Sequence, residues 1–489
     1  MAAEDREIPQ RSSALLRFFV PSIAGVRSRA LNIVAPIFRH EVPAMSRPVR
    51  LLLQSMLVCG ASLALLILSS SPSSTPVVNA DVLTAEDGRQ WYRGNLHTHS
   101  LWSDGDDYLE MIASWYQDHD YDFLCFTDHN VLATNRDRWI DVAKKNTGET
   151  ALKELKERFP GDWVEERKNN DRHEVRLKTF DEVNARLAVP GKFLLIQGEE
   201  ITDRFGNLPV HMNATNVQQL IPPLHGDSVA ETIQNNVNAV IAQRERTRQP
   251  MFIHLNHPNF GYGVTAEDLM RIRGEQFFEV YNGHPGVRNS GDNQHASTER
   301  IWDIILTKRL AEFDLPIMYG LATDDGHNYH KIPSRASEPG RGWVMVLSDK
   351  LAPASLIEAM ERGDFYASSG VSLDRVESTD KELKVTVKAE ESLTYRIEFI
   401  GTRIGYDAKS QPVVNANGKE IRATRRYSED IGEVLKTVEG VTAAYSFVGD
   451  EIYVRARVVS SRKHPNPSEL DEFERAWVQP VIPTGVPKK

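Results

Sequence analysis

Short apolar segments alternate with helical ones between residues 85 and 370, and this alternation limits the folds open to the chain. The apolar runs lie at Phe123–Thr127, Phe193–Gln197, Met251–Leu255, Phe277–Tyr281 and Pro316–Thr323. Segments with helical periodicity, such as Val229–Arg248 and Thr298–Phe313, lie between them. Strands that are apolar on both faces are typical of parallel sheets covered by helices. The pattern therefore predicts an α/β fold with a parallel sheet or barrel over residues 85–370.

One stretch interrupts this pattern, at about residues 136–190. It is rich in Lys, Glu, Asp and Asn and has a helical pattern around 152–159. We interpret it as a charged, largely helical insertion between two strands, with its charges on the surface.

The hydrophobic period changes to two after residue 370. Leu383, Val385 and Val387 alternate with polar residues, and Tyr453–Val458 repeats the pattern. Asn417-Gly418 is a hairpin signal between them. We expect a small, separate, antiparallel β-sandwich-like domain over 371–489, with a structural or docking role and a partner that the sequence leaves open.

The first 80 residues have the pattern of an N-terminal extension and an export signal. Arg47 and Arg50 precede an apolar run at 51–68, and Val78-Asn79-Ala80 offers the small residues of a cleavage site. The sequence predicts export to the periplasm or the extracellular space, with an uncleaved membrane anchor as the alternative. Met45 is the better candidate for the true start.

Charge and cysteine usage exclude two classes of protein. The chain has 58 Lys and Arg against 68 Asp and Glu, a net charge of -10, which does not fit a dedicated nucleic-acid binder. Its two cysteines, Cys59 and Cys125, cannot build a disulfide framework or a thiolate metal cage. Any metal ion must therefore be held by nitrogen and oxygen.

Side chains that bind metals follow several of the apolar runs. His97 and His99 are two residues apart, so in an extended segment they point to the same face. Most of the other candidates lie at or just past the end of an apolar run, where one rim of a barrel would collect them. These candidates are Asp104, His129, Glu200, His211, His257, Asp325 and His327.

Taken in chain order, these motifs resemble the PHP superfamily, the polymerase and histidinol phosphatase metallohydrolases. HxH, SDG, TDH, GxE, a mid-chain His, HP and DxH occur in the family's order over roughly residues 90–370. The exported start, Tyr366–Gly370 and Arg475-Ala476-Trp477 are similar to the branch that includes carbaryl-hydrolase-like enzymes. The resemblance implies a distorted (β/α)7 barrel.

The resemblance also implies a set of metal ligands. His97, His99 and Asp325 would bind a first ion. Glu200 would bridge it to a second ion held by His211 and His257. Asp104, His129 and His327 would hold a third ion. Many relatives have a histidine at the position of Asp104, so the identity and occupancy of the third site stay open.

Six imidazoles and three carboxylates suit two or three divalent ions and favour Zn, Mn or Fe over Mg or Ca. Three ions would leave a net charge of about +3, which suits a phosphate ester, and two would leave about +1, which also allows a neutral carbamate, amide or ester. His97, His99, Glu200 and Asp325 would act through a metal-bound hydroxide. We expect a metal-dependent hydrolase of a small anionic ester, with phosphoesterase activity favoured.

Other polar residues near these motifs receive weaker assignments. Asn282 and His284 are candidate substrate contacts at the rim. Glu199 neighbours Glu200 on a strand and faces the other way, so we expect it at the surface or behind the ligands. Asp128 is expected to orient a loop or a ligand, and His254 to be a hydrogen-bonded core histidine. A non-catalytic envelope protein that binds metal and ligand is the remaining alternative.

Overall fold

The computed structural model describes residues 88–274 and 276–484 of the chain. The predicted signal peptide or anchor over 1–80 lies outside these described residues. Among the residues that are described, no helix combines the length and the apolar character needed to cross a membrane.

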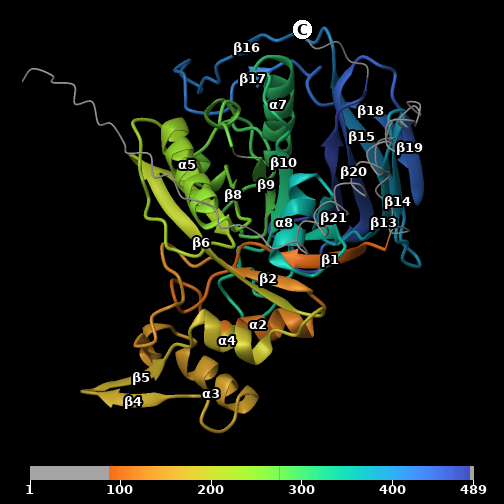
Figure 1. Cartoon of the computed structure of the whole chain (residues 1–489). Helices are drawn as coiled ribbons and strands as arrows, with labels where there is room; N and C mark the ends of the chain where they lie inside the picture. The colour runs from red at the N-terminus through yellow and green to blue at the C-terminus, as the bar shows by residue number, and fades with distance from the viewer. Residues whose placement is uncertain (1–87, 275, 485–489) are drawn as a thin grey trace, which may run out of the picture. The chain divides into compact units, whose positions relative to one another are not determined.

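Seven consecutive strands of a 13-stranded sheet carry the candidate site (Figure 1). In sheet order they are β10 (Tyr319–Thr323), β9 (Phe277–Asn282), β8 (Phe252–Leu255), β7 (Leu208–Thr215), β6 (Leu194–Phe205), β2 (Phe123–Phe126) and β1 (Gln90–Asn95). Beyond the ends of the two outermost strands, Thr98 and Gly326 form a parallel bridge. The bridge brings the segments that follow β1 and β10 side by side. The five strands predicted from apolar runs are all present.

The sheet is not parallel throughout, which corrects the sequence-based expectation. β7 pairs antiparallel with both β6 and β8. The hairpin between β6 and β7 turns at Gly206, whose φ of 60° suits a glycine. Because β6 runs on to Phe205 to pair with β7, Glu200 lies inside a strand rather than at its end.

Helices flank these strands, and two of them match the predicted segments closely. α5 (Val229–Thr247) begins after Ser228, whose side chain accepts a hydrogen bond from the backbone of Glu231. α7 (Thr298–Ala311) is capped in the same way by Ser297. The others in this part of the chain are α2 (Leu109–Asp118), α6 (Ala266–Leu269) and α8 (Pro353–Glu361).

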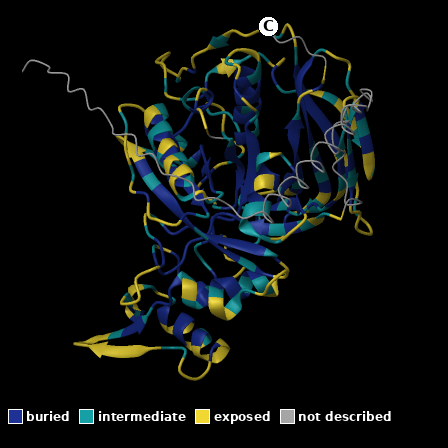
Figure 2. Ribbon diagram, in the orientation of Figure 1, coloured by how far each residue is buried: buried dark blue, intermediate teal, exposed yellow. Residues whose placement is uncertain are grey.

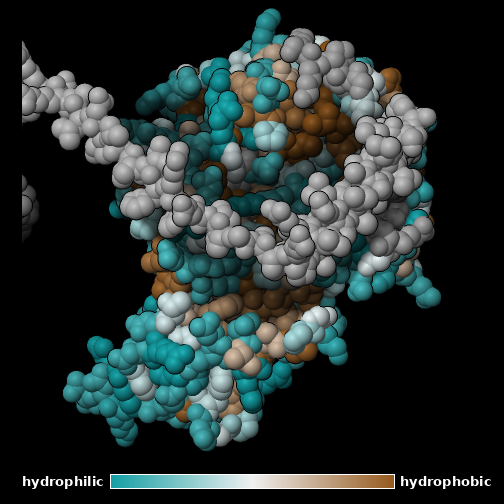
Figure 3. Space-filling view, in the orientation of Figure 1, coloured by the Kyte–Doolittle hydropathy of each residue, from teal (hydrophilic) through white to brown (hydrophobic). Residues whose placement is uncertain are grey.

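The insertion is a small α/β unit rather than a mainly helical one. Its helices are α3 (Gly148–Arg158) and α4 (Phe180–Leu187), and its strands β3 (Trp139–Asp141), β5 (Arg172–Arg176) and β4 (Glu166–Asn169) form a three-stranded sheet. Every residue of β4 is exposed, so no apolar alternation marks it in the sequence. Apolar side chains of α3 and β5 pack with those of α2 in one core. The outer face of the insertion is exposed and hydrophilic (Figures 2 and 3).

The C-terminal strands extend the large sheet and add a second one. β11 (Trp343–Ser348), β12 (Phe365–Ser368), β21 (Phe473–Val481), β20 (Glu451–Lys463), β15 (Tyr395–Arg403) and β18 (Glu433–Glu439) continue the 13-stranded sheet. β13 (Leu373–Ser378), β14 (Glu382–Val387) and β19 (Thr442–Ser446) form a separate antiparallel sheet, and β16 (Ser410–Gln411) pairs with β17 (Arg426–Tyr427). The antiparallel pattern predicted after residue 370 is present. The predicted domain boundary at residue 370 falls between β12 and β21, and these two strands pair in one sheet. The division into two domains therefore stays a prediction.

A buried ion pair joins α7 to β20. The guanidinium of Arg455 donates to Asp303 through Nε at 2.8 Å and through Nη2 at 2.7 Å. The hydroxyl of Tyr453 donates to the same carboxylate at 2.7 Å. Both charged side chains are buried. The bidentate pair therefore links the helix layer to the C-terminal strands at a point that water does not reach.

Asp303→Ala should destabilise the protein strongly, because it removes the bidentate partner of the buried Arg455 and leaves its guanidinium only a 3.5 Å contact with Glu299. We expect the free energy of unfolding to fall by about 3–5 kcal/mol, measured by urea denaturation. Lys153→Ala is the control, since it breaks an exposed pair with Glu157 and should cost less than about 1 kcal/mol. Equal losses in the two variants would contradict the structural role of the buried pair.

Candidate metal centre

All nine predicted ligands converge on one region, seven from segments that follow strands and two, Glu200 and His211, from within β6 and β7. Their nitrogen and oxygen atoms form four overlapping groups, each with its atoms within 4.8 Å of one another. The groups are His97, His99 and Glu200; His97, His257 and Asp325; Glu200, His211 and His257; and His99, Asp104, His129 and His327. Segments separated by more than 200 residues therefore meet in one cluster.

Distances at the predicted first site, made of His97, His99 and Asp325, are those of atoms that share a cation. Oδ1 of Asp325 lies 3.2 Å from Nε2 of His97 and 3.2 Å from Nε2 of His99. Two ligands that are each about 2.0–2.2 Å from one ion lie about 3.0–3.5 Å apart. Among the described residues, neither Nε2 atom has a hydrogen-bond partner, although both are buried. Buried imidazole nitrogens without partners fit a metal ion.

Glu200 lies at the centre of the cluster and contacts ligands of every predicted site. Its Oε1 is 3.1 Å from Nδ1 of His211 and 3.5 Å from Nε2 of His257. Its Oε2 is 3.4 Å from Nε2 of His99 and 2.6 Å from Nδ1 of His129. Oε1 also accepts a hydrogen bond from the amide of Asn256 at 2.8 Å. The two oxygens thus face different groups, as a bridging carboxylate requires.

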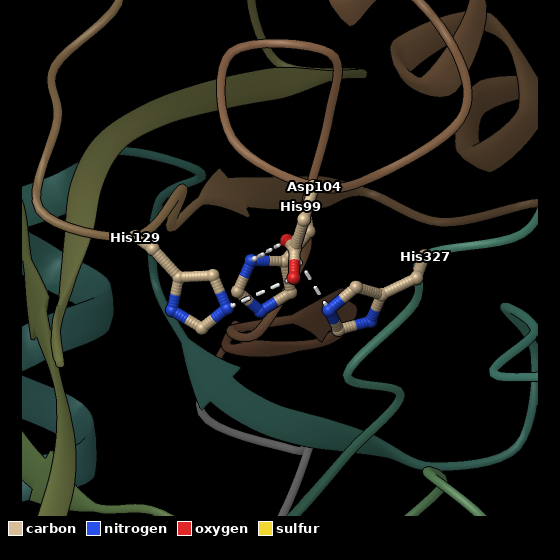
Figure 4. Close-up of side chains that lie close together, drawn as sticks. All are labelled: His99, Asp104, His129 and His327. Atoms are coloured by element: carbon tan, nitrogen blue, oxygen red, sulfur yellow. Dashed lines mark ion pairs between the residues drawn. The ribbon is translucent and has the colours of Figure 1, made fainter. Parts of the chain in front are cut away.

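The group of His99, Asp104, His129 and His327, called the third group from here on, is drawn together by Asp104 (Figure 4). Its carboxylate oxygens lie 3.4 Å from Nε2 of His129 and 3.4 Å from Nε2 of His327. Nδ1 of His99 is 3.7 Å from the same carboxylate. The ring of His99 stacks on that of His327, with centroids 4.1 Å apart. His99 therefore lies between the predicted first and third sites, whereas the sequence placed it in the first alone.

Hydrogen bonds to Nδ1 hold three of the ligand rings in place. Nδ1 of His97 lies 2.7 Å from Glu279, and Nδ1 of His129 lies 2.5 Å from the hydroxyl of Thr202. Nδ1 of His327 bonds to the backbone carbonyl of Asp325 at 2.8 Å. Such contacts fix the tautomer and the orientation of metal-binding histidines. Nε2 is thereby left facing the cluster in His97 and His327. In His129 both nitrogens face ligands, since Nδ1 lies 2.6 Å from Glu200 and Nε2 lies 3.4 Å from Asp104.

Glu279 is the residue that sequence reasoning missed. It is fully buried in β9 and accepts hydrogen bonds from His97, the Thr323 hydroxyl, the backbone of His257 and the amide of Asn282. It therefore holds in place the two segments that carry the ligands His97 and His257. A charged residue inside the apolar run Phe277–Tyr281 was the signal that could have found it.

The two candidate substrate contacts have different surroundings. Asn282 is buried, and its amide nitrogen donates to Glu279 at 2.8 Å and to Asp325 at 3.2 Å. These bonds position a ligand carboxylate. His284 is partly exposed, with its ring centroid 5.7 Å from that of His327. Substrate contact by either residue stays a prediction.

Electrostatics of the cluster favour cations. Burial acts to raise the pKa values of Glu200 and Asp325, but the neighbouring histidines hold both well below their usual range. Burial acts to lower the pKa of His97, but Asp325, Glu279 and Glu200 raise it well above its usual value. Burial, followed by the charges of His327 and His129, lowers the pKa of His99 to about 3. A proton on His97 thus offsets part of the buried negative charge, a role that divalent ions would also fill.

Backbone strain occurs at two ligands. His257 has a φ of 24° and Asp325 a φ of 51°, both in the left-handed region that residues with a side chain rarely adopt. Each follows the end of a strand, β8 and β10 respectively. Strained backbone of this kind is concentrated at functional sites.

Neighbouring polar residues support the ligand loops. Asp128 accepts hydrogen bonds from the backbone and hydroxyl of Ser100 and from the hydroxyl of Ser103, so it orients a loop as predicted. His254 is buried as predicted. Neither of its ring nitrogens has a hydrogen-bond partner among the described residues, which corrects the expectation of a bonded core histidine. Its Nε2 lies 3.5 Å from Glu279.

Glu199 does point away from the ligand cluster, but it is not at the surface. It is fully buried, and its Oε1 accepts a hydrogen bond from the backbone of Ile221 at 2.7 Å. Burial raises the pKa of this carboxyl to about 8. The side chain is therefore neutral in the folded protein at pH 7.

Comparison with known proteins leaves the family open. No family model matches the chain, and no curated protein matches its sequence. One similar solved structure is a two-domain protein from Bacteroides vulgatus that contains a predicted PHP-like metal-dependent phosphoesterase. It has 14% sequence identity and a TM-score of 0.33, over 84% of this chain and 100% of that chain.

Glu279→Gln should weaken metal binding. The amide nitrogen cannot accept the hydrogen bonds that the carboxylate receives, and a negative charge beside His97 is lost. Loss of such a partner costs about 10–100-fold in metal affinity, which chelator competition measures. Glu451→Gln changes a buried glutamate in β20 and is the matched control. Unchanged affinity in Glu279→Gln would exclude the supporting role.

Glu199→Gln should stabilise the protein increasingly as pH rises. The pKa of Glu199 in the folded protein, about 8, exceeds its value in the unfolded chain. Its contribution to wild-type stability is therefore fully present below the unfolded pKa. That contribution is lost as the pH rises from the unfolded to the folded pKa. The variant lacks this loss and should gain roughly 1.4 kcal/mol per pH unit across that window. Urea denaturation at pH 5 and pH 8 measures it, with exposed Glu157→Gln as control. A gain that does not change with pH would contradict the buried, neutral state.

Proposed function

We propose that this chain is a metal-dependent hydrolase of the PHP superfamily, with phosphoesterase activity, and that its strands form the distorted (β/α)7 barrel of that family. We further propose that the protein is exported, as its first 80 residues predict. A small anionic ester is the proposed substrate.

The observation that carries this proposal is the convergence of nine nitrogen and oxygen ligands from separate segments. Their mutual distances match shared ions, and His97 and His99 present buried nitrogens without hydrogen-bond partners among the described residues. Two or three divalent ions fit this set. When bound, they supply Lewis-acid polarisation of the ester and a water of lowered pKa.

Residues of the chain would hold and orient those ions. Glu200 faces several groups and is the natural bridge. Glu279 keeps Nε2 of His97 directed at the cluster, and Asn282 does the same for the carboxylate of Asp325. Since the inner groups are buried and Asp104 is half exposed, an ester would approach over the third group.

Net charge connects the third ion to the substrate class. Glu279 adds a fourth carboxylate to Asp104, Glu200 and Asp325, and its pKa is held low by the neighbouring histidines although burial opposes this. Three divalent ions then give +6 against -4, which suits a phosphate ester. Two ions balance the four carboxylates, which suits a neutral carbamate, amide or ester. Hydrolysis of those neutral substrates is therefore the second candidate function.

The proposal predicts bound metal and hydrolysis in the purified protein. We expect at least two ions per chain by elemental analysis and turnover of bis(4-nitrophenyl) phosphate above that of an aryl carbamate. His97→Ala and Glu200→Ala should each lower both metal content and kcat/KM, the latter by at least about 1000-fold.

His119→Ala is the matched control, because this exposed histidine at the end of α2 stacks on Trp115 outside the cluster. It should retain full metal content and turnover. Stoichiometric metal without turnover of either substrate class would favour the alternative of a non-catalytic protein that binds metal and ligand. Full turnover in metal-depleted His97→Ala would rule out the proposed role of the cluster.

A further inference from the structure

The third group is the exposed side of the metal centre. The side chain of Asp104 is 53% exposed and that of His129 24%, whereas those of His97, His99 and Glu200 are fully buried. A ligand that reaches the cluster from solvent therefore meets the third group first. Whatever adjoins Asp104 is in a position to contact the part of the ligand that does not react.

The insertion is what adjoins Asp104. The ammonium of Lys145 donates a hydrogen bond to the backbone carbonyl of Asp104. The guanidinium of Arg138 donates to the backbone carbonyl of Trp102 and lies over that ring, 4.8 Å from its centroid. The indole of Trp102 in turn donates to the backbone of Lys178 at 3.1 Å. The loop that carries Asp104 is thus bonded to the insertion at several points.

A cavity of about 410 Å³ opens in the insertion beside this loop. Leu101 lines it, and three residues of chain place the Cα atoms of Leu101 and Asp104 at most about 11 Å apart. None of the nine metal ligands lines the cavity. The cavity is therefore separate from the metal centre. It is close enough that a medium-sized organic molecule held at the third group could extend into it.

The lining of the cavity combines apolar side chains with cations. Leu101, Ile140 and Leu177 are buried apolar residues of the lining. Arg138, Lys144 and Arg172 line it as well. These features suit a ligand that has an apolar body and an acidic group.

The two carboxylates of the lining are engaged with other groups. Glu174 receives hydrogen bonds from Nε of Arg167 at 2.7 Å and from the amide of Asn169. Oδ1 of Asp141 accepts a hydrogen bond from the backbone of Ala143 at 3.2 Å, and its Oδ2 lies 3.9 Å from Nε of Arg172, a cation of the same lining. Three cations against two carboxylates leave the lining with a net positive charge.

We propose that this cavity binds an acidic group on the apolar, non-reacting part of the substrate, so that the preferred substrate is an ester with an apolar body and a second negative charge. The identification of the bound molecule as a substrate rests on the proposed hydrolase function. Binding of an amphipathic anion in the cavity does not depend on turnover.

Naphthalene-1-sulfonate tests the binding directly on the metal-loaded protein by calorimetry. The double variant Lys144→Glu and Arg172→Glu should weaken its Kd at least ten-fold. The matched control is Lys153→Glu with Lys168→Glu, which makes the same charge change at exposed positions outside the cavity lining. The control should change Kd less than two-fold.

Two results would overturn the inference. One is an equal Kd in the two double variants. The other is loss of binding in His129→Ala with normal binding in the cavity variant, since the anion would then occupy the third metal group.

Kinetics separate this inference from the proposed function. The cavity variant should raise KM about ten-fold for a ring-sulfonated naphthyl phosphate and leave KM for unsubstituted naphthyl phosphate unchanged. If neither ester is hydrolysed but the Kd changes as expected, the hydrolase proposal fails and the cavity assignment stands. If both are hydrolysed and neither KM nor Kd responds to the cavity variant, the cavity assignment alone fails.

Discussion

Burial of carboxylates among imidazoles is the constraint on which this structure depends. Glu200, Asp325 and Glu279 lie in the interior, where an uncompensated charge is costly. Imidazoles surround all three, and these carboxylates raise the pKa of the buried His97 well above its usual value, so without ions a proton on that ring offsets part of the negative charge. A divalent ion balances the same carboxylates with shorter contacts and uses the nitrogens of His97 and His99 that have no hydrogen-bond partner in the described part of the chain. The interior is therefore arranged for cations.

The fold provides this arrangement by bringing strand ends together. The bridge between Thr98 and Gly326 places the histidines after β1 beside the ligands after β10, and the hairpin of β6 and β7 brings Glu200 and His211 together. Strain at His257 and Asp325 accompanies their position in the cluster. Hydrogen bonds with Glu279, Thr202 and Asn282 then orient the side chains of His97, His129 and Asp325. The backbone thus sets where each ligand lies, and these bonds set which way its side chain points.

The ligand set could be predicted because most of the ligands follow an apolar run that is readable from its own sequence, and because the order of the motifs resembles that of a known superfamily, which implied the full set. The antiparallel direction of β7 could not be predicted, since it is decided by the strands with which β7 pairs. The strand β4 could not be predicted either, since it is exposed throughout and lacks apolar alternation. Burial of Glu199 was missed for a related reason. Alternation along a strand shows that it faces away from Glu200 but cannot show that the loop at Ile221 covers it. Glu279 was missed because a single acidic residue in an apolar run has no motif.

Anomalous diffraction at metal absorption edges, on crystals of the protein, tests the central claim most directly. The account predicts two or three anomalous peaks within coordinating distance of the nine ligands, with Glu200 in contact with at least two of them. It also predicts that Asp104, His129 and His327 surround any third peak. Absence of every peak near Glu200 in protein prepared with Zn, Mn and Fe, with the side chains otherwise in place, would contradict the account.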